Sequence, residues 1–281
     1  MVKIKITADS TCDLSEELIK KYGVEIIPLM IIKGDECLKD GFEIKPQEVF
    51  DYFCEGKRIC TTSAVNVMGY KEVFAKFADD YDAVIHFNIS SGFSGTCQNA
   101  KLAAEDFSNV YVVDTKNLST GTGLMVLRGA EMAAAGCTPE EITAEMAEMA
   151  EKVEASFVID TLEYLAKGGR CSSVTALATG LLKIKPCINV VDGGMKVGKK
   201  YRGNFEHCIK LYVNDRLKDR DDIDTKRIFI THTSCEEKVV AEVRAIIKDY
   251  FDFDEVLETV AGCTVSSHCG PNTLGILFVR K

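Results

Sequence analysis

Short apolar runs alternate with amphipathic segments along the first half of the chain. The apolar runs predict strands over residues 3–8, 24–32, 83–89 and 110–113. Apolar residues at helical spacing predict helices that end near residue 22 and that cover residues 46–53, 67–77, 99–107 and 121–135. Either Asp13 or Ser15 can cap the first of these helices. Alternating strands and helices of this length form a mainly parallel sheet with helices on both faces, so this half is predicted to be an α/β domain.

An acidic amphipathic segment over residues 138–153 closes the first half. Thr138 is suited to the N-cap and Pro139 to the first helical position, and Glu140 and Glu141 follow in the first turn. We place a domain boundary near residue 150. Residues 1–150 are then an N-terminal α/β domain and residues 151–281 a C-terminal domain.

The second half departs from regular alternation and predicts an α+β domain with a mixed sheet. A short strand is expected over residues 157–160 and a short helix over 162–167, followed by small apolar residues over 174–182. Two strands over 187–191 and 195–201 flank Asp192-Gly193-Gly194 and predict a hairpin. Further helices and strands lead to a last buried strand over 274–279.

Composition narrows the class of protein. The chain has 281 residues, of which 46% are hydrophobic and 27% charged, which is typical of a globular protein. The net charge of −9 argues against nucleic acid and anionic membranes as partners, because both attract basic surfaces. No signal peptide is recognisable and no apolar run approaches the roughly 20 residues of a membrane span, so we expect a cytoplasmic protein without stable membrane insertion.

Twelve cysteines are scattered along the chain, many of them inside apolar segments. None of them forms a CxxC pair, which is the spacing that a structural zinc site usually needs. The pattern favours reduced thiols that pack as small hydrophobic side chains. We therefore expect neither disulfide bonds nor a metal site.

The stretch SSGFSGTCQNA, residues 90–100, joins a predicted strand to a predicted helix. A nucleophile elbow, G-x-S-x-G, does not fit, because the second glycine, Gly95, comes one place too early after Ser94. The chain also lacks the Gly-Lys-Ser/Thr end of a P-loop. What remains is a helix start at which backbone N–H groups and the Ser94 hydroxyl, next to Gly95, can bind an anion. The alternative is that Ser94 only caps its own helix.

Two further polar clusters carry candidate residues. Thr61-Thr62-Ser63 precedes the helix expected from residue 67 and can likewise be no more than a cap. Residues 266–272, SSHCGPN, are predicted to be a polar turn between two apolar strands. His268 within it is either a surface loop residue or part of a site.

Taken together, five stretches in the same order resemble the DegV family, the bacterial fatty-acid-binding proteins of the FakB type. Residues 6–14 resemble the opening T-D-S-x-x-D-L motif, and Thr62-Ser63 matches the start of T-S-x-P-S. Residues 90–96 match S-S-x-L-S-G-T, and residues 162–170 match L-x-x-L-x-K-G-G-R. His268-Cys269-Gly270-Pro271 resembles the H-T-G-P loop. The resemblance covers nearly the whole chain.

This resemblance implies a carrier without catalytic residues, cofactor or metal. In the family a long-chain fatty acid such as palmitate, stearate or oleate is buried in the protein. The matched residues imply that Thr62 and Ser94 hold its carboxylate, with Gly95 beside them, and that Arg202 and His268 lie near the head group. A separate ATP-dependent fatty acid kinase then phosphorylates the carboxylate, and the acyl phosphate enters phospholipid synthesis.

Four positions depart from the family pattern, and two other classes of function stay open. Val65 and Asn66 replace Pro and Ser, Cys269 replaces Thr, and Asn272 replaces a usual Gly. These changes bear on the chain length and unsaturation that the pocket prefers. The main alternative function is a serine-dependent acyl hydrolase that uses Ser94 and His268, and a second is an interaction module that binds no lipid.

Overall fold

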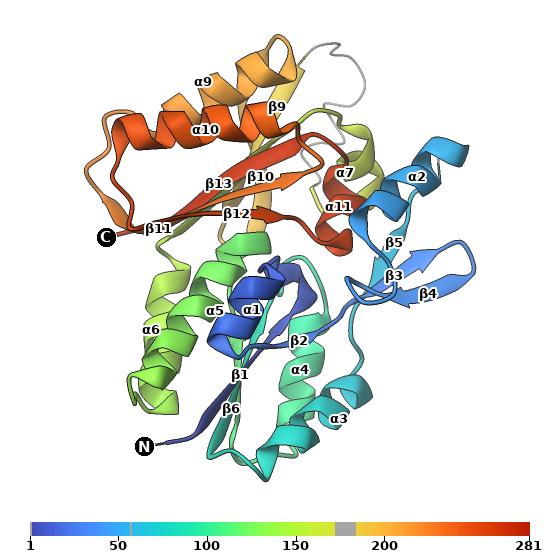
Figure 1. The fold of residues 1–281 in the computed structure, drawn as a ribbon. Helices are drawn as coiled ribbons and strands as arrows, with labels where there is room; N and C mark the ends of the chain where they lie inside the picture. The colour runs from blue at the N-terminus through green and yellow to red at the C-terminus, as the bar shows by residue number, and fades with distance from the viewer. Residues whose placement is uncertain (1, 57, 172–183) are drawn as a thin grey trace.

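A parallel four-stranded sheet forms the centre of the N-terminal half, which lies in the lower part of Figure 1. The computed structural model describes residues 2–56, 58–171 and 184–281. The strand order is β2-β1-β6-β7, and every neighbouring pair is parallel. The strands are β1 (Ile4–Asp9), β2 (Glu25–Ile27), β6 (Ala83–Asn88) and β7 (Val110–Asp114).

Alternate residues of this sheet face two different layers of helices. Ile6 and Ile85 belong to a buried cluster with residues of α1 (Glu16–Tyr22), α5 (Ser119–Ala134) and α6 (Pro139–Ala150). Val84, one residue before Ile85, packs instead with residues of α3 (Val67–Ala78) and α4 (Thr96–Ala104). The alternation follows from the two-residue period of a strand. The predicted parallel sheet with helices on both faces is confirmed.

A small antiparallel sheet of order β4-β3-β5 stands beside the N-terminal half. Its strands are β3 (Met30–Lys33), β4 (Glu36–Lys39) and β5 (Thr61–Ser63), and α2 (Pro46–Gly56) packs next to it. The single strand predicted over residues 24–32 is therefore wrong. Pro28 has no N–H to donate, and the N–H of Leu29 donates to Ser10 Oγ, so the chain leaves one sheet at this point and enters another.

The C-terminal half contains a mixed six-stranded sheet of order β10-β9-β8-β13-β11-β12. β11 and β12 pair in parallel and the other neighbours are antiparallel. The strands are β8 (Val153–Ile159), β9 (Ile184–Val191), β10 (Gly194–Arg202), β11 (Ile223–Thr233), β12 (Glu255–Val260) and β13 (Thr273–Arg280). The predicted α+β half with a mixed sheet is confirmed, and the β9–β10 hairpin turns at Asp192 and Gly193 as expected.

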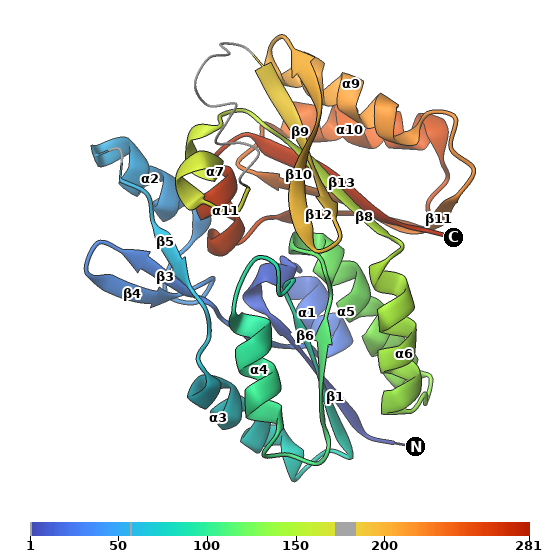
Figure 2. The ribbon, with the colours of Figure 1, turned by 180° about the vertical axis from the view of Figure 1, so that it is seen from behind.

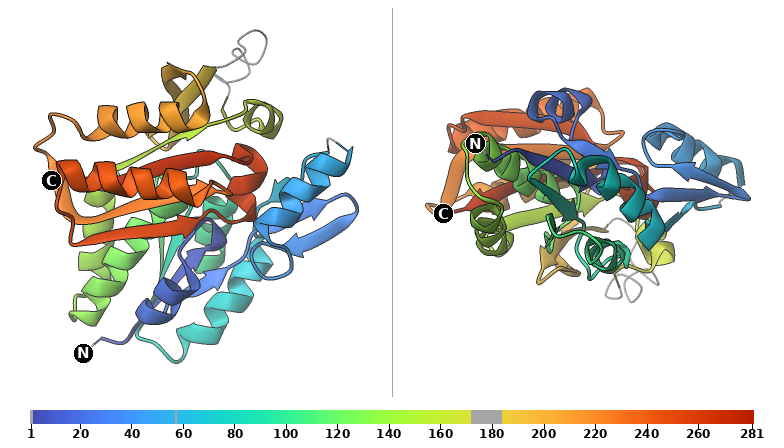
Figure 3. Two further views of the ribbon diagram at one scale, coloured as in Figure 1. Left: turned by 45° about the horizontal axis from the view of Figure 1, so that its top comes forward. Right: turned by 90° about the horizontal axis from the view of Figure 1, so that it is seen from below.

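Helices and the hairpin complete the C-terminal half. α9 (Phe205–Leu217) and α10 (Glu237–Tyr250) lie side by side across one face of the six-stranded sheet (Figure 3). The β9–β10 hairpin reaches toward the N-terminal half (Figure 2), where Ser90 Oγ donates to the carbonyl oxygen of Gly193 over 2.7 Å. The hairpin therefore links the two halves directly.

Helix α5 lies between the two large sheets. Its residues 119–127 are all buried, and residues 124–127 share one apolar cluster with Ile85 of the N-terminal sheet and with Phe229 and Leu277 of the C-terminal sheet. A helix that is buried on all sides needs apolar or small residues around its whole circumference, which its glycines and leucines supply. The two halves thus share part of one core.

Several element boundaries differ from the predictions. Residues 266–272 are not a simple turn, because α11 (Cys263–Cys269) occupies most of them, and α7 covers Glu163–Gly168. The helix after Thr138 ends at Ala150, before β8 begins. Thr138 is its N-cap as expected, and Glu141 completes a capping box with it. The apolar segment 174–182 lies outside the described residues. The division into domains near residue 150 stays a prediction.

Candidate functional site

A cavity of about 220 Å³ lies beyond the C-terminal ends of the parallel strands. This edge, next to the point where the strand order reverses between β1 and β6, is the usual place for ligands in open α/β sheets. Polar and charged side chains form part of the wall: Thr62, Ser63, Ser94, Arg170, Thr264 and His268. Apolar side chains form most of the rest: Leu29, Ile89, Phe93, Leu118, Met195 and Val265.

Ser94 is placed by the loop between β6 and α4. Gly95 is the N-cap residue of α4, and Ser94 Oγ accepts the N–H of Thr96 over 3.2 Å. Ser94 therefore precedes the N-cap residue, and this bond satisfies the first N–H of the helix without a side-chain cap at Gly95. The bond uses the hydroxyl as an acceptor, so the Ser94 proton remains available to donate to a ligand in the cavity.

Thr62 lies on β5, where it pairs with Ile31 of β3, and does not cap the following helix. Asn66 does so, since its side chain accepts the N–H of Gly69. Thr62 Oγ1 lies 2.9 Å from Nε2 of His268, which comes from α11. The structure thus brings Thr62, Ser94, Gly95 and His268 to one cavity.

His268 is a neutral imidazole at neutral pH. Burial lowers the pKa of His268 to about 4, and the positive charge of Arg170 lowers it further in the same direction. Its buried Nδ1 has no hydrogen-bond partner among the described residues. A proton on Nδ1 would be a buried donor without an acceptor, so the proton belongs on Nε2. Nε2–H then donates to Thr62 Oγ1 and leaves the Thr62 proton free for a ligand.

Gly168 makes room for this imidazole. A Cβ atom on Gly168 would lie 2.3 Å from His268 Nδ1, so any larger residue would displace the ring. Gly270, in a left-handed conformation with φ of 76°, similarly leaves space for the ring of Tyr164. Neither glycine was singled out as a site residue from the sequence, although Gly168 belongs to the stretch over 162–170 that carried the resemblance.

The two arginines are placed differently from the expectation. Arg202 is exposed at the end of β10 and is not among the described residues that line the cavity. Arg170 lines the cavity instead, and its guanidinium donates to the carbonyl oxygen of Gly168 over 2.8 Å. The head-group role of Arg202 stays a prediction, and Arg170 is the cation that the described structure supplies at this site.

A serine hydrolase is not supported by this arrangement. Within the described ranges, no hydrogen bond joins Ser94 to a histidine, because His268 is bonded to Thr62. An imidazole with a pKa of about 4 is also a weak base at neutral pH. Cys269 offers no replacement nucleophile, since burial raises the pKa of its thiol to about 12 and keeps it protonated.

The apolar wall continues into a second, smaller cavity of about 20 Å³. Leu118, Val265 and Cys269 line both cavities. The smaller one extends toward Phe157 and Leu277 of the six-stranded sheet. The apolar wall of the site therefore borders a smaller cavity next to the C-terminal sheet.

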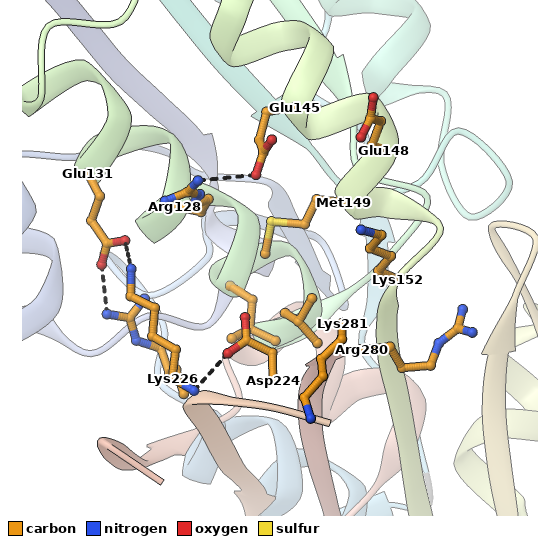
Figure 4. Close-up of a pocket in the computed structure, with 13 residues that line it drawn as sticks. Arg128, Glu131, Glu145, Glu148, Met149, Lys152, Asp224, Lys226, Arg280 and Lys281 are labelled. Atoms are coloured by element: carbon orange, nitrogen blue, oxygen red, sulfur yellow. Dashed lines mark hydrogen bonds and ion pairs between the residues drawn. The ribbon is translucent and has the colours of Figure 1, made fainter. Parts of the chain in front are cut away.

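A third cavity, of about 290 Å³, has a different character (Figure 4). Charged side chains of α5, α6 and β11 face one another in it, and they pair among themselves. Arg128 bonds Glu145 over 3.2 Å, and Glu131 bonds Arg227 over 2.9 Å and also Lys226. The two Glu131 pairs join the N-terminal half to β11, and charged walls of this kind do not suit an apolar ligand.

Other types of site find little support in the part of the chain that the structure describes. No group of three or more His, Cys, Asp and Glu side chains there could hold a metal ion. All twelve cysteines are free thiols, and most are buried. No helix within residues 2–56, 58–171 and 184–281 is long and apolar enough to cross a membrane.

Comparison with known proteins places the chain in a family. The family model of the uncharacterised DegV proteins matches residues 3–281. A DegV domain-containing protein of Caldanaerobacter subterraneus is 34% identical over the full length of both chains. The structure of a DegV family protein from Thermus thermophilus, described as fatty acid binding, is 31% identical, with a TM-score of 0.89 over 99% of this chain and 100% of that one.

A further solved structure is a stearic acid-binding protein from Eubacterium ventriosum. It is 26% identical and superposes with a TM-score of 0.84 over 99% of this chain and 98% of that one. The order of the sheets and helices is thus shared over the whole length. The match of the family model over residues 3–281, together with the full-length relative, shows that this chain belongs to the DegV family.

Proposed function

We propose that this protein binds a long-chain fatty acid and holds its carboxylate for phosphorylation by a separate ATP-dependent fatty acid kinase. The observation that carries the proposal is that Thr62 and Ser94, each with a hydroxyl proton to donate, line one cavity together with mostly apolar side chains. Relatives of the same fold are described as binding fatty acids, one of them stearic acid. Palmitate, stearate and oleate are the ligands we expect.

The polar end meets the needs of a carboxylate. A buried carboxylate without partners costs several kcal/mol, so it requires donors on its oxygens. Thr62 and Ser94 each have a free hydroxyl proton, and Arg170 adds a positive charge nearby. Because the whole protein carries a net charge of −9, this local arrangement must provide the attraction.

The apolar wall meets the needs of an acyl tail. Roughly fourteen methylenes at about 0.8 kcal/mol each offer about 11 kcal/mol before the costs of association and ordering. Leu118 and Val265 continue from the larger cavity into the smaller one and mark the path that we infer for the tail. The departures at Val65, Asn66, Cys269 and Asn272 then bear on the preferred chain length.

A carrier of this kind needs neither a cofactor nor a general base of its own. The neutral His268 supports Thr62 and does not activate a nucleophile, so the phosphoryl group must come from another protein. We therefore assign the chemistry to the kinase, in the cytoplasm, and presentation of the carboxylate to this chain. The acyl phosphate that leaves is an activated acyl donor for phospholipid synthesis.

Denaturing extraction of the purified protein followed by mass spectrometry tests the proposal. We expect one long-chain fatty acid per chain. Ser94→Ala and Thr62→Ala should both slow acyl phosphate formation with a fatty acid kinase. A protein that yields no lipid and takes up none would overturn the proposal. Hydrolysis of a chromogenic acyl ester that is lost in Ser94→Ala would favour the hydrolase instead.

A further inference from the structure

The stretch Asp9–Asp13 carries two buried carboxylates that lie outside the cavity wall. Asp9 is fully buried at the end of β1, and its carboxylate accepts three hydrogen bonds. The donors are the Tyr70 hydroxyl over 2.7 Å, Asn88 Nδ2 over 3.0 Å and the N–H of Ile89 over 2.9 Å. A buried carboxylate with this many donors ties the elements that supply them to one another.

Asp9 holds the loop that carries Ser94 at both of its ends. At the first end it accepts the N–H of Ile89, whose side chain lines the cavity. At the second end the link runs through Tyr70, whose hydroxyl bonds Asp9 and also lies 2.7 Å from Thr96 Oγ1. Thr96 in turn donates its N–H to Ser94 Oγ. Asp9 is therefore connected to the Ser94 hydroxyl through Tyr70 and through Thr96, whose side chain bonds Tyr70 and whose backbone N–H bonds Ser94.

Ser10 and Asp13 hold the opposite side of the site through α11. The Ser10 hydroxyl donates to Asp40 over 2.9 Å, and the Asp40 carboxylate accepts the N–H groups of Cys263 and Thr264. Asp13 accepts the N–H of Gly262 over 2.8 Å. These N–H groups form the first turn of the helix that ends near His268, so its position depends on residues some 250 places earlier in the chain.

We propose that Asp9, Ser10 and Asp13 are positioning residues that set the geometry between the two donors, Ser94 on one side and the Thr62–His268 pair on the other. The inference rests on the proposed function, because it concerns the binding of a carboxylate between those donors. A carboxylate needs both hydroxyl protons within hydrogen-bond distance at the same time. One short stretch that anchors both sides therefore fixes the separation between the two donors.

Single-hydroxyl variants test this without removing a buried carboxylate. Tyr70→Phe breaks the chain toward Ser94, and Ser10→Ala breaks the chain toward α11. Each should raise the Kd for oleate on the order of tenfold, as expected when a buried hydrogen-bonding group loses its partner. Tyr111→Phe and Ser15→Ala are matched controls, since their hydroxyls serve Glu140 and the N-terminus of α1, and should leave the Kd unchanged.

Double-mutant cycles separate positioning from a general loss of stability. Tyr70→Phe should be non-additive with Ser94→Ala and additive with Thr62→Ala. Ser10→Ala should show the reverse, non-additive with Thr62→Ala and additive with Ser94→Ala. The inference would be overturned if either variant coupled equally to Ser94→Ala and to Thr62→Ala. An unchanged Kd in both variants would overturn it as well.

A ligand-free readout keeps the test independent of the proposed function. The chain has four histidines, so the His268 imidazole signals can be assigned by NMR with a His268→Asn variant. Ser10→Ala should shift the His268 signals, and Tyr70→Phe should leave them in place. If the wild-type protein binds no oleate, the proposed function fails while this comparison still decides whether Ser10 positions α11. Unmoved His268 signals in Ser10→Ala would contradict the positioning role.

Discussion

Thr62 Oγ1 and His268 Nε2 lie 2.9 Å apart, although 206 positions separate the two residues in the chain. Thr62 comes from the short sheet beside the N-terminal half, and His268 comes from a helix of the C-terminal half. The hydrogen bond therefore exists only when the two halves are packed together. It leaves the Thr62 hydroxyl proton free for a ligand, so the proposed carboxylate site depends on the packing of the two halves.

Removing this hydroxyl should weaken both the site and the fold. Thr62→Val keeps the shape of the side chain but leaves His268 Nε2–H without an acceptor. We expect the free energy of unfolding to fall by about 1–3 kcal/mol and fatty acid binding to weaken at least tenfold. Urea denaturation and competition with a fluorescent fatty acid measure the two effects. Thr61→Val, one residue earlier and exposed, is the control and should change neither.

Gly168 gives a test of the imidazole position. Gly168→Ala places a methyl group 2.3 Å from His268 Nδ1, so the ring must move away from Thr62. We expect a loss of about 1–3 kcal/mol in the free energy of unfolding, together with weaker fatty acid binding. Gly194→Ala is the matched control, because the nearest atom to its new Cβ lies 3.8 Å away. Equal effects of the two substitutions would contradict the proposed contact.

Substitution of Arg170, but not of Arg202, should change the pKa of His268. The positive charge of Arg170 lowers the pKa of His268, so Arg170→Gln should raise that pKa toward its ordinary value. Fatty acid binding should weaken only several-fold, since the Arg170 side chain is exposed and its charge is screened by solvent. Arg202→Gln should leave both quantities unchanged. A larger loss of binding in Arg202→Gln would instead restore the head-group role expected from the sequence.

Titration of Asp13 and titration of His268 should change the free energy of unfolding in opposite directions as the pH rises. Burial raises the pKa of Asp13 to about 7 from 3.8, so between these values the folded chain holds a proton that the unfolded chain releases. Ionisation of Asp13 therefore lowers the free energy of unfolding as the pH rises, by up to about 1.4 kcal/mol per pH unit. His268 acts in the other direction, because its folded pKa of about 4 lies below the ordinary 6.5 and the unfolded chain binds the proton.

Single variants separate the two titrations. Relative to wild type, Asp13→Asn should gain free energy of unfolding as the pH rises from about 4 to about 7. His268→Asn should lose it, again relative to wild type, between about 4 and about 6.5. Urea denaturation at several pH values across this range measures both differences. Parallel pH curves for wild type and Asp13→Asn would show that Asp13 does not titrate in this window.

Local patterns in the sequence were sufficient for most elements of the fold. The apolar run before Ser90 and the helix start at Gly95 placed Ser94 correctly beyond the end of a central strand. Asp192 and Gly193 marked the hairpin turn, and Thr138 marked a helix start. These features depend on residues a few positions apart, so the periodicity, caps and turns of the sequence itself determine them.

The small sheet and α11 could not be predicted in the same way. One apolar run over residues 24–32 continues into two different sheets: Pro28 interrupts it, and the N–H of Leu29 donates to Ser10 Oγ instead of to a neighbouring strand. The sequence of α11 is short and polar, and carboxylates of Asp13 and Asp40 complete its first turn. No local pattern records a partner that lies more than 200 residues away.

In the candidate site, too, the local sequence predicts some features and tertiary packing decides the others. The sequence alone placed Thr62, Ser94, Gly95 and His268 in three separate polar stretches. The resemblance to the DegV family predicted that they bind one carboxylate. Only the tertiary structure decided that Thr62 and His268 bond to each other, and that Arg170 rather than Arg202 stands among the described lining residues. The physical reason is that packing of α11 and β5 brings these side chains together, whereas their local sequences specify only the elements that carry them.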